Sequence, residues 1–172
     1  MISVIVFTKD RPMQLDAYLE SLMHYSKLNE RQISIIYKEN KKINYKKVIE
    51  KYSNCNWIYE DNFYEDLIKA IALSEEYIVF GCDDVVFKNS LPIEYAESLL
   101  KNSKEIFGFS FRLGKNIKPI PNSVLRIGQH MEWEWAGVTE AHYNYPWELD
   151  CTLYRKGDIQ NILNSFDGKM TL

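Results

Sequence analysis

The first half of the chain alternates between short apolar runs and longer amphipathic stretches. The apolar runs have the length and composition of buried strands, whereas the longer stretches place apolar side chains three and four residues apart, as one face of a helix does. The strands predicted in this way lie at 2–7, 33–37, 57–59 and 77–80. The helices predicted between them run from about 13 to 26, from Tyr45 to Tyr52 and from Phe63 to Ile71. Alternation of this kind favours a mostly parallel sheet with helices on its faces.

The second half of the chain is less regular, because its apolar runs are shorter and loops separate them. Its predicted segments are a helix at 92–100, a strand at 106–111, a loop at 114–128, a short strand at 151–154 and a last helix through Ile159 to Phe166. Asp158 is expected to cap that last helix, since an Asp side chain accepts hydrogen bonds from the free N–H groups of a first turn. The residues after Phe166 are expected to fray.

Composition excludes several classes of protein. The chain has 172 residues, of which 46 % are hydrophobic, so it is long and apolar enough to bury the core of one domain. Its net charge is −3 and no basic stripe is visible, which argues against nucleic-acid binding. No apolar run approaches the length of a transmembrane segment, and the start of the sequence lacks the basic leader and cleavage site of a signal peptide.

The cysteines carry information about the compartment. Cys55, Cys82 and Cys151 are odd in number and widely spaced. They fit neither a disulfide framework nor the spacing of zinc ligands. Reduced thiols are typical of cytoplasmic proteins, so a cytoplasmic location is expected.

Two adjacent carboxylates, Asp83 and Asp84, follow the apolar run that begins at Tyr77. A strand that ends in paired acids delivers them to the carboxyl edge of a sheet, where open α/β sheets bind their ligands. Divalent cations that bridge phosphates are held by one or two carboxylates together with phosphate oxygens. The pair therefore indicates a metal–phosphate site, with a solvated turn after a buried strand as the alternative.

The first strand also ends in polar residues. Thr8, Lys9, Asp10 and Arg11 lead into Pro12, which suits the first turn of the following helix because its missing N–H costs little there. This strand–loop–helix unit has no glycine-rich fingerprint, so neither a dinucleotide-binding fold nor a P-loop is indicated.

These two motifs carry a resemblance to a known family. The segment Ile2-Ser-Val-Ile-Val-Phe-Thr-Lys-Asp-Arg-Pro-Met-Gln-Leu-Asp-Ala-Tyr-Leu-Glu-Ser-Leu22 resembles the opening of family-2-type glycosyltransferases with the GT-A fold. The segment from Asp66 to Asp84 is similar to the helix and strand that lead into the family's metal-binding acidic motif. The matches span roughly residues 1–90. The family's acidic end of the second strand is replaced here by Tyr37, Lys38 and Glu39.

The resemblance implies an α/β fold, a GT-A-like Rossmann-type three-layer sandwich with a mostly parallel central sheet. It implies a single domain over residues 1–172, in which 1–90 bind nucleotide-sugar and metal and 91–172 bind the acceptor. The residues expected to contact the nucleotide-sugar are Thr8, Asp10, Arg11, Tyr37 and Asp83. The cofactor expected is Mn²⁺ or Mg²⁺, and its candidate ligands are Asp84, Asp83 and His142. His142 is otherwise an exposed loop histidine.

The implied activity is transfer of a sugar from a nucleotide-sugar, by default a UDP-sugar, to a glycan or lipid-linked acceptor, in polysaccharide biosynthesis. The alternative is a non-catalytic or degenerate GT-A domain that binds nucleotide-sugar or glycan within a larger assembly. Binding of UDP with Mn²⁺ but without turnover would distinguish the two. The oligomeric state is left open.

The second half offers candidates for the acceptor side. An inverting transfer needs a base for the acceptor hydroxyl, and Asp150, next to a short strand, is favoured over Glu148. A capping or salt-bridging role is the alternative for both acids. The tryptophans expected to stack on sugar rings, or to pack in the core, are Trp133, Trp135 and Trp147. If residues 132–135 are extended, Trp133 and Trp135 share one face, and Glu132 and Glu134 share the other.

Overall fold

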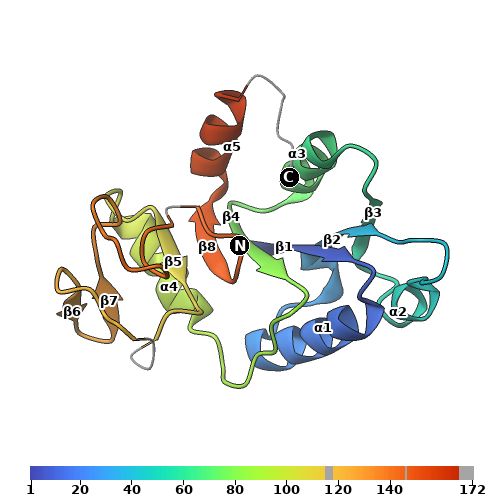
Figure 1. The fold of residues 1–172 in the computed structure, drawn as a ribbon, viewed down its shortest axis with the longest axis horizontal. Helices are drawn as coiled ribbons and strands as arrows, with labels where there is room; N and C mark the ends of the chain where they lie inside the picture. Colours follow the sequence, from blue (N-terminus) through green and yellow to red (C-terminus); the bar gives the residue numbers. More distant parts are fainter. Residues whose placement is uncertain (115–117, 146, 167–172) are drawn as a thin grey trace.

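A six-stranded sheet runs through the molecule in the order β3-β2-β1-β4-β8-β5 (Figure 1). The computed structural model describes residues 1–114, 118–145 and 147–166. The strands of the sheet are β1 (Ile2–Lys9), β2 (Ile33–Lys38), β3 (Asn56–Tyr59), β4 (Tyr77–Cys82), β5 (Gly108–Ser110) and β8 (Thr152–Arg155). The helices are α1 (Pro12–Ser26), the 3₁₀ turn η1 (Glu30–Gln32), α2 (Lys46–Lys51), α3 (Phe63–Leu73), α4 (Ile93–Asn102) and α5 (Lys156–Asn164). None of the helices in the described ranges combines the length and the hydropathy that crossing a membrane requires.

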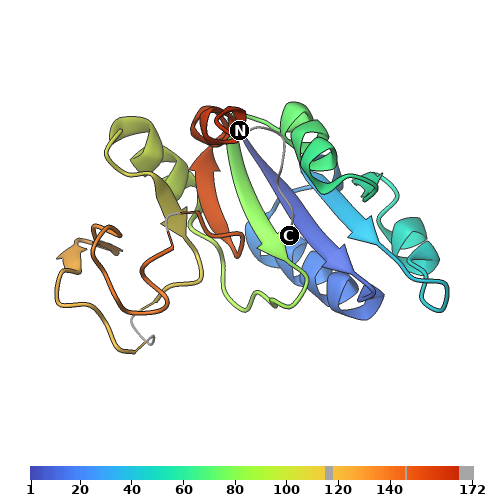
Figure 2. The same ribbon diagram turned by 45° about the horizontal axis from the view of Figure 1, so that its top comes forward.

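Strand direction decides which segments lie at the edge of the sheet where the carboxyl ends of β1 and β4 are found. β1 pairs in parallel with β2 and β4, and β2 pairs in parallel with β3. The carboxyl ends of β1 and β4 therefore lie side by side, with Phe7 paired to Cys82 (Figure 2). β8 is antiparallel to β4 and pairs Thr152 with Phe80. Because β8 runs the opposite way, the residues that precede it reach this same edge.

Apolar residues of β1 pack alternately on the two faces of the sheet. Val4 and Val6 belong to a core cluster that includes side chains of α1, α2 and α4. Ile5 between them belongs to a second cluster with side chains of α3 and α5. Figure 1 shows α1 and α2 on one side of the sheet and α3 and α5 on the other. The predicted three-layer α/β sandwich with a mostly parallel sheet is confirmed.

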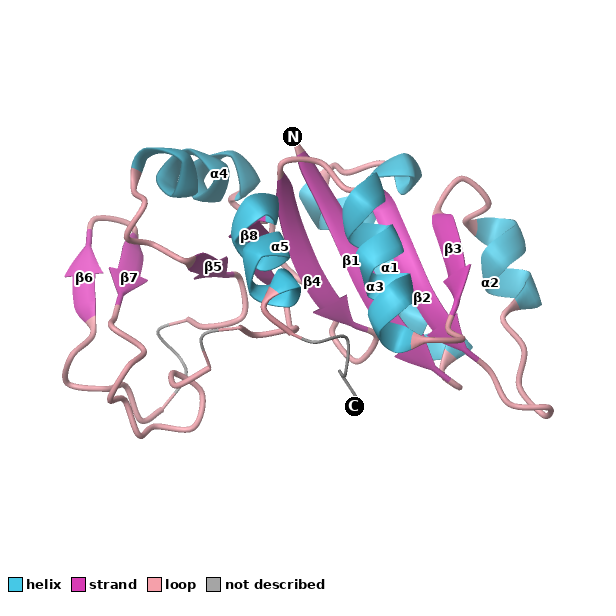
Figure 3. Ribbon diagram, turned by 90° about the horizontal axis from the view of Figure 1, so that it is seen from above, coloured by secondary structure: helices cyan, strands magenta, loops and turns pink. Residues whose placement is uncertain are grey.

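Two segments of the second half differ from the sequence-based expectation. The strand predicted at 106–111 is reduced to β5. The loop predicted at 114–128 contains β6 (Leu125–Ile127), which forms a hairpin with β7 (His130–Glu132) just beyond it; the turn between the two strands uses Gly128 at a φ of +57°. This hairpin lies beyond β5 and α4 at one end of the molecule (Figure 3). Three-residue strands are too short to show a period in the sequence, and the side chains of β6 are all exposed. Residues 115–117 lie outside the described part of the chain.

The expectation that Asp158 caps the last helix is wrong. The N-cap of α5 is Arg155, and no side-chain hydrogen bond caps the helix. Asp158 lies inside the first turn and accepts a hydrogen bond from Arg155 Nη1 at 2.9 Å. An acid in a first turn still interacts favourably with the positive end of the helix dipole. Residues 167–172, which were expected to fray, are outside the described ranges.

Candidate active site

The two adjacent acids after β4 have different surroundings. Asp83 is 5 % exposed, and its Oδ2 accepts a hydrogen bond from the Thr8 hydroxyl at 2.6 Å. Arg11 forms an ion pair with the same carboxylate, with 3.4 Å between Nη1 and Oδ1. Asp84 is exposed. One acid of the pair is thus anchored to the end of β1 and to the loop after it, while the other faces solvent at the edge of the sheet.

Asp10 connects the loops that follow β1 and β2. Its backbone lies in the left-handed region, with a φ of 59°. Its N–H donates to the Lys38 carbonyl oxygen at 3.0 Å, and its Oδ1 accepts from the backbone N–H of Asn40 at 2.7 Å. A non-glycine residue in this region costs conformational energy, and such residues concentrate at functional sites. The bonds to Lys38 and Asn40 hold Asp10 there, at the mouth of the predicted nucleotide site.

Tyr37, near the end of β2, lies in a group of aromatic rings. Its ring centroid is 5.2 Å from that of Tyr45, 5.6 Å from that of Trp57 and 5.4 Å from that of Tyr59. The side chain is half-buried, and burial raises the pKa of its hydroxyl. The structure thus gives Tyr37 a packing role. Its predicted contact with the nucleotide stays a prediction.

The two candidate bases of the second half, Glu148 and Asp150, both pair with one guanidinium group. Arg112, just after β5, pairs with Glu148 through Nη2 and lies 3.5 Å from Asp150 through Nε. Glu148 also accepts hydrogen bonds from the hydroxyls of Thr152 at 2.9 Å and Ser110 at 3.3 Å. Its side chain is only 13 % exposed, against 33 % for Asp150. Glu148 is therefore fully engaged in holding β5 to β8, and Asp150 is the more accessible carboxylate.

The environment of Asp150 makes it a better base than an ordinary surface acid. Burial is the largest influence and raises the pKa of its carboxyl, with the negative charges of Glu148 and Asp84 acting in the same direction. The positive charge of Arg112 opposes them and lowers the pKa. The backbone N–H of Cys151 donates to the Phe80 carbonyl oxygen at 2.8 Å, which places Asp150 beside the end of β4 that leads into Asp83 and Asp84. The structure therefore brings to one edge of the sheet predicted acids that lie far apart in the sequence.

Cys82 is the last residue of β4 and directly precedes the acidic pair. Its Sγ donates to the Leu149 carbonyl oxygen at 3.6 Å. Burial raises the pKa of the thiol to about 11, and the charges of Asp150, Asp84 and Asp83 add to that shift. Because the thiolate is the reactive form of cysteine, Cys82 acts as packing at this edge rather than as a nucleophile.

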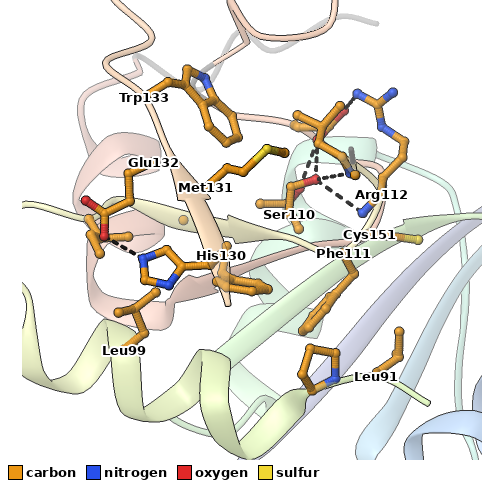
Figure 4. Close-up of a pocket in the computed structure, with 18 of the residues that line it drawn as sticks. Leu91, Leu99, Ser110, Phe111, Arg112, His130, Met131, Glu132, Trp133 and Cys151 are labelled. Carbon is orange, nitrogen blue, oxygen red and sulfur yellow. Dashed lines mark hydrogen bonds and ion pairs between the residues drawn. The ribbon is translucent and has the colours of Figure 1, made fainter. Parts of the chain in front are cut away.

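Trp133 and Trp135 line a cavity of about 1240 Å³ that is bounded by β5, the hairpin, the segment after β7, the segment before α4 and α4 itself. Figure 4 shows Trp133 at this cavity, beside Met131. Trp133 donates from Nε1 to the Tyr143 carbonyl oxygen at 2.9 Å. Trp135 is 47 % exposed. Glu132 and Glu134 line the same cavity. The separation of tryptophans and glutamates onto two faces was expected only for an extended segment, and this condition is not met because β7 ends at Glu132 and the chain after it is not a strand.

Trp147 is not with the other two tryptophans. Its ring packs against Phe80 of β4 at a centroid distance of 6.1 Å, beside the core cluster on the α3 and α5 face. Its indole Nε1 is buried and has no hydrogen-bond partner among the described residues. Contact of Trp147 with substrate stays a prediction.

The predicted metal site can be tested against the donor groups present. His142 is exposed, and its Nδ1 lies 3.5 Å from Arg112 Nη1. Within the part of the chain that is described, no three His, Cys, Asp or Glu side chains form a ready-made metal cage. Exposed Asp84 beside anchored Asp83 nevertheless fits Mg²⁺ or Mn²⁺. These ions take one or two carboxylates and complete their coordination with phosphate oxygens and water.

Sequence reasoning missed two residues of this site. Arg112 follows directly on the predicted strand 106–111, so its place at a strand end was the signal that could have identified it. Tyr45 was predicted only as part of a helical stripe, yet its hydroxyl contacts both Thr8 and Arg11. Nothing in the local sequence distinguishes Tyr45 from the other aromatic residues of that stripe.

The sheet is mostly parallel, carries paired acids at the end of β4, and has the antiparallel strand β8 of the second half beside β4. This is the GT-A-type architecture of nucleotide-sugar glycosyltransferases. The comparisons with known proteins agree. No protein-family model matches the chain. Its sequence is 32 % identical over 193 residues to the bifunctional glycosyltransferase pgtA of Dictyostelium discoideum. That match covers 95 % of this chain and 25 % of pgtA.

Solved structures of TarS from S. aureus show the same fold. The structure of TarS 1–349 superposes with a TM-score of 0.63 at 14 % identity, covering 99 % of this chain and 51 % of that chain. The same protein in complex with UDP-GlcNAc gives a TM-score of 0.56 at 14 % identity, covering 94 % of this chain and 47 % of that one. The chain thus spans about a quarter of its curated relative and about half of TarS 1–349. It has the GT-A-type fold, and its sequence is related to a glycosyltransferase, as predicted.

Proposed function

We propose that this chain is a glycosyltransferase domain that transfers a sugar from a UDP-sugar to a glycan or lipid-linked acceptor with the help of a divalent cation. The observation that carries the proposal is that Asp83, Asp84 and Asp150 lie at the same edge of the sheet, because residues 149–151 bond to Phe80 and Cys82 at the end of β4. Asp83 is anchored there, Asp84 is exposed and Asp150 is half-buried. Its relationship to pgtA supports glycosyl transfer. The TarS structures with UDP and with UDP-GlcNAc support UDP as the nucleotide.

On the donor side, Asp84, with Asp83 behind it, would hold Mn²⁺ or Mg²⁺ against the diphosphate. Such an ion offsets the negative charge that builds on the leaving nucleoside diphosphate. The guanidinium of Arg11 has a side-chain exposure of 52 % beside Asp83, so it can reach a phosphate oxygen. Thr8, Asp10 and Arg11 leave β1 next to the acidic pair, and we place the nucleoside across them.

On the acceptor side, Asp150 is the base of an inverting transfer. It takes the proton of the acceptor hydroxyl as that oxygen bonds to the anomeric carbon and the bond to the diphosphate breaks. The raised pKa of Asp150 suits this role, because a base works best when its pKa lies near the working pH. Glu148 holds Arg112 in place and thereby orients Asp150.

The cavity lined by Trp133 and Trp135 is the proposed acceptor site. Arg112 and Glu148 also line it, so the cavity adjoins the proposed base. The exposed indole of Trp135 offers a flat apolar surface of the kind on which sugar rings stack. We also place the protein in the cytoplasm, because its cysteines Cys55, Cys82 and Cys151 are free.

Calorimetry with UDP in the presence and absence of Mn²⁺ tests the donor site. Wild type is expected to bind UDP in a Mn²⁺-dependent way, and Asp84→Asn is expected to lose that dependence because one carboxylate ligand is removed. Glu94→Gln, which neutralises an exposed acid on α4, is the matched control and should bind as wild type does.

Two outcomes would contradict the proposal. If Asp84→Asn binds UDP and Mn²⁺ as tightly as wild type, the metal assignment is wrong. If wild type binds UDP but releases none from any UDP-sugar supplied with glycan or lipid-linked acceptors, the chain is a binding module rather than an enzyme.

A further inference from the structure

The structure contains a directed chain of hydrogen bonds behind the acidic pair, and Tyr45 is its central link. Tyr45, the N-cap residue of α2, is fully buried. Its hydroxyl oxygen lies 2.8 Å from the Thr8 hydroxyl and accepts from the backbone N–H of Arg11 at 2.9 Å. Its own backbone N–H donates to Glu39 at 2.9 Å, which fixes the residue from the opposite side.

The direction of these bonds follows from counting protons. Thr8 donates to Asp83 Oδ2 at 2.6 Å, and this bond uses the single hydroxyl proton of Thr8. The contact between Thr8 and Tyr45 therefore requires Tyr45 to donate. The chain runs from the Arg11 N–H to the Tyr45 hydroxyl, then to the Thr8 hydroxyl and finally to the Asp83 carboxylate.

Such a chain orders the site before any ligand arrives. Bonds in series polarise one another, and a buried network in which every member has a partner fixes one arrangement of its groups. Burial raises the pKa of the Tyr45 hydroxyl, so the group stays protonated and keeps its proton to donate. Asp83 is the carboxylate adjacent to Asp84, and its position limits where Asp84 can lie.

We infer that Tyr45 is a positioning residue for the nucleoside diphosphate and its cation: it fixes Thr8 and the Arg11 backbone, and through Thr8 it fixes Asp83. The inference rests on the proposed function, since it assigns Tyr45 to the same donor site. Among the described residues, no hydrogen bond joins Tyr45 to Asp83 or Asp84, so Tyr45 reaches Asp83 through Thr8.

Tyr52 provides a matched control on the same helix. It follows α2 as the C-cap residue and is 3 % exposed. Its hydroxyl bonds to Asp16 Oδ1 at 2.8 Å, away from the acidic pair. Tyr45→Phe and Tyr52→Phe thus each remove one buried, hydrogen-bonded hydroxyl from an end of α2. Only the first breaks the chain to Asp83.

The experiment combines UDP calorimetry in the presence of Mn²⁺ with urea unfolding. Both variants are expected to unfold at a lower urea concentration than wild type. Tyr45→Phe is expected to bind UDP about tenfold more weakly, a factor that corresponds to roughly one net hydrogen bond. Tyr52→Phe should bind as wild type does, which separates a positioning role from a loss of stability.

A double-mutant cycle with Thr8→Val tests whether Tyr45 acts through Thr8. If it does, Tyr45→Phe has a smaller effect once the Thr8 hydroxyl is gone, and the effect that remains reports the contact with the Arg11 backbone. Wild-type affinity in Tyr45→Phe, or additive losses in the double variant, would overturn the inference. Should Tyr45→Phe not fold, Thr8→Val breaks the same chain nearer to Asp83, and undiminished UDP binding by that variant would overturn the inference equally. If wild type itself does not bind UDP, the proposed function fails instead.

Discussion

Gly81, two residues before Asp83, leaves no room for a side chain. A methyl group at this position would lie 2.0 Å from the hydroxyl oxygen of Tyr18, 2.8 Å from its Cζ and 3.2 Å from its Cε2. Tyr18 belongs to α1 and is fully buried, so its rigid ring cannot turn out of the way. Gly81→Ala therefore forces β4 and α1 apart directly beneath the candidate site.

The size of the effect follows from these contacts. Extra atoms in a well-packed core typically cost about 1–3 kcal/mol, and a contact at 2.0 Å cannot be relieved by a small adjustment. The Tyr18 hydroxyl has no hydrogen-bond partner within the described ranges, so its removal in Tyr18→Phe is expected to cost little. The Gly81→Ala/Tyr18→Phe double variant loses the shortest contact and should recover part of the stability.

Urea unfolding followed by tryptophan fluorescence measures these differences. Gly157→Ala is the matched control, because a methyl group there meets nothing within 4 Å and lies in the first turn of α5. It is expected to be at least as stable as wild type, since Ala favours helix over Gly. A Gly81→Ala variant within about 0.5 kcal/mol of wild type, the usual range of harmless surface changes, would refute the packing argument. So would a double variant no more stable than Gly81→Ala alone.

Two further predictions concern Asp150. Asp150→Asn should lower turnover by about 10²–10⁴-fold with unchanged UDP binding. Asp150→Asn should not lower the free energy of unfolding at pH 7. Because the pKa of Asp150 is raised in the folded protein, this carboxyl contributes stability at low pH, and the contribution is lost as pH rises through the folded-state pKa. At pH 7 the ionised carboxylate is therefore already unfavourable to folding. A rate near that of wild type would remove Asp150 as the base. Arg112→Gln removes the charge that lowers the pKa of Asp150, so the acid limb of the pH–rate profile should move to higher pH; an unmoved limb would contradict the assignment.

The local sequence was enough to predict the sheet of the first half and the acids that it carries. β1 and β4 are clear apolar runs and α1 has a clear apolar period. Polar residues end the two runs: Thr8 near the end of β1, Arg11 in the loop after it and Asp83 after β4. Parallel strands bring such ends to one edge by geometry alone. The meeting of Thr8 and Asp83 could therefore be expected, although their hydrogen bond could not.

The tertiary structure alone decided how the second half completes the site. β8 inserts antiparallel between β4 and β5, and this pairing joins residues far apart in the sequence. It places Glu148 and Asp150 on Arg112 and brings Asp150 beside the end of β4 that leads into Asp83 and Asp84. No local period encodes such a pairing, because it depends on which strand fills the free edge of β4. The role of the Tyr45 hydroxyl cannot be read from the local sequence for the same reason. Its hydrogen-bond partners lie in β1 and in the loop after β1, and only the tertiary packing brings the start of α2 next to them.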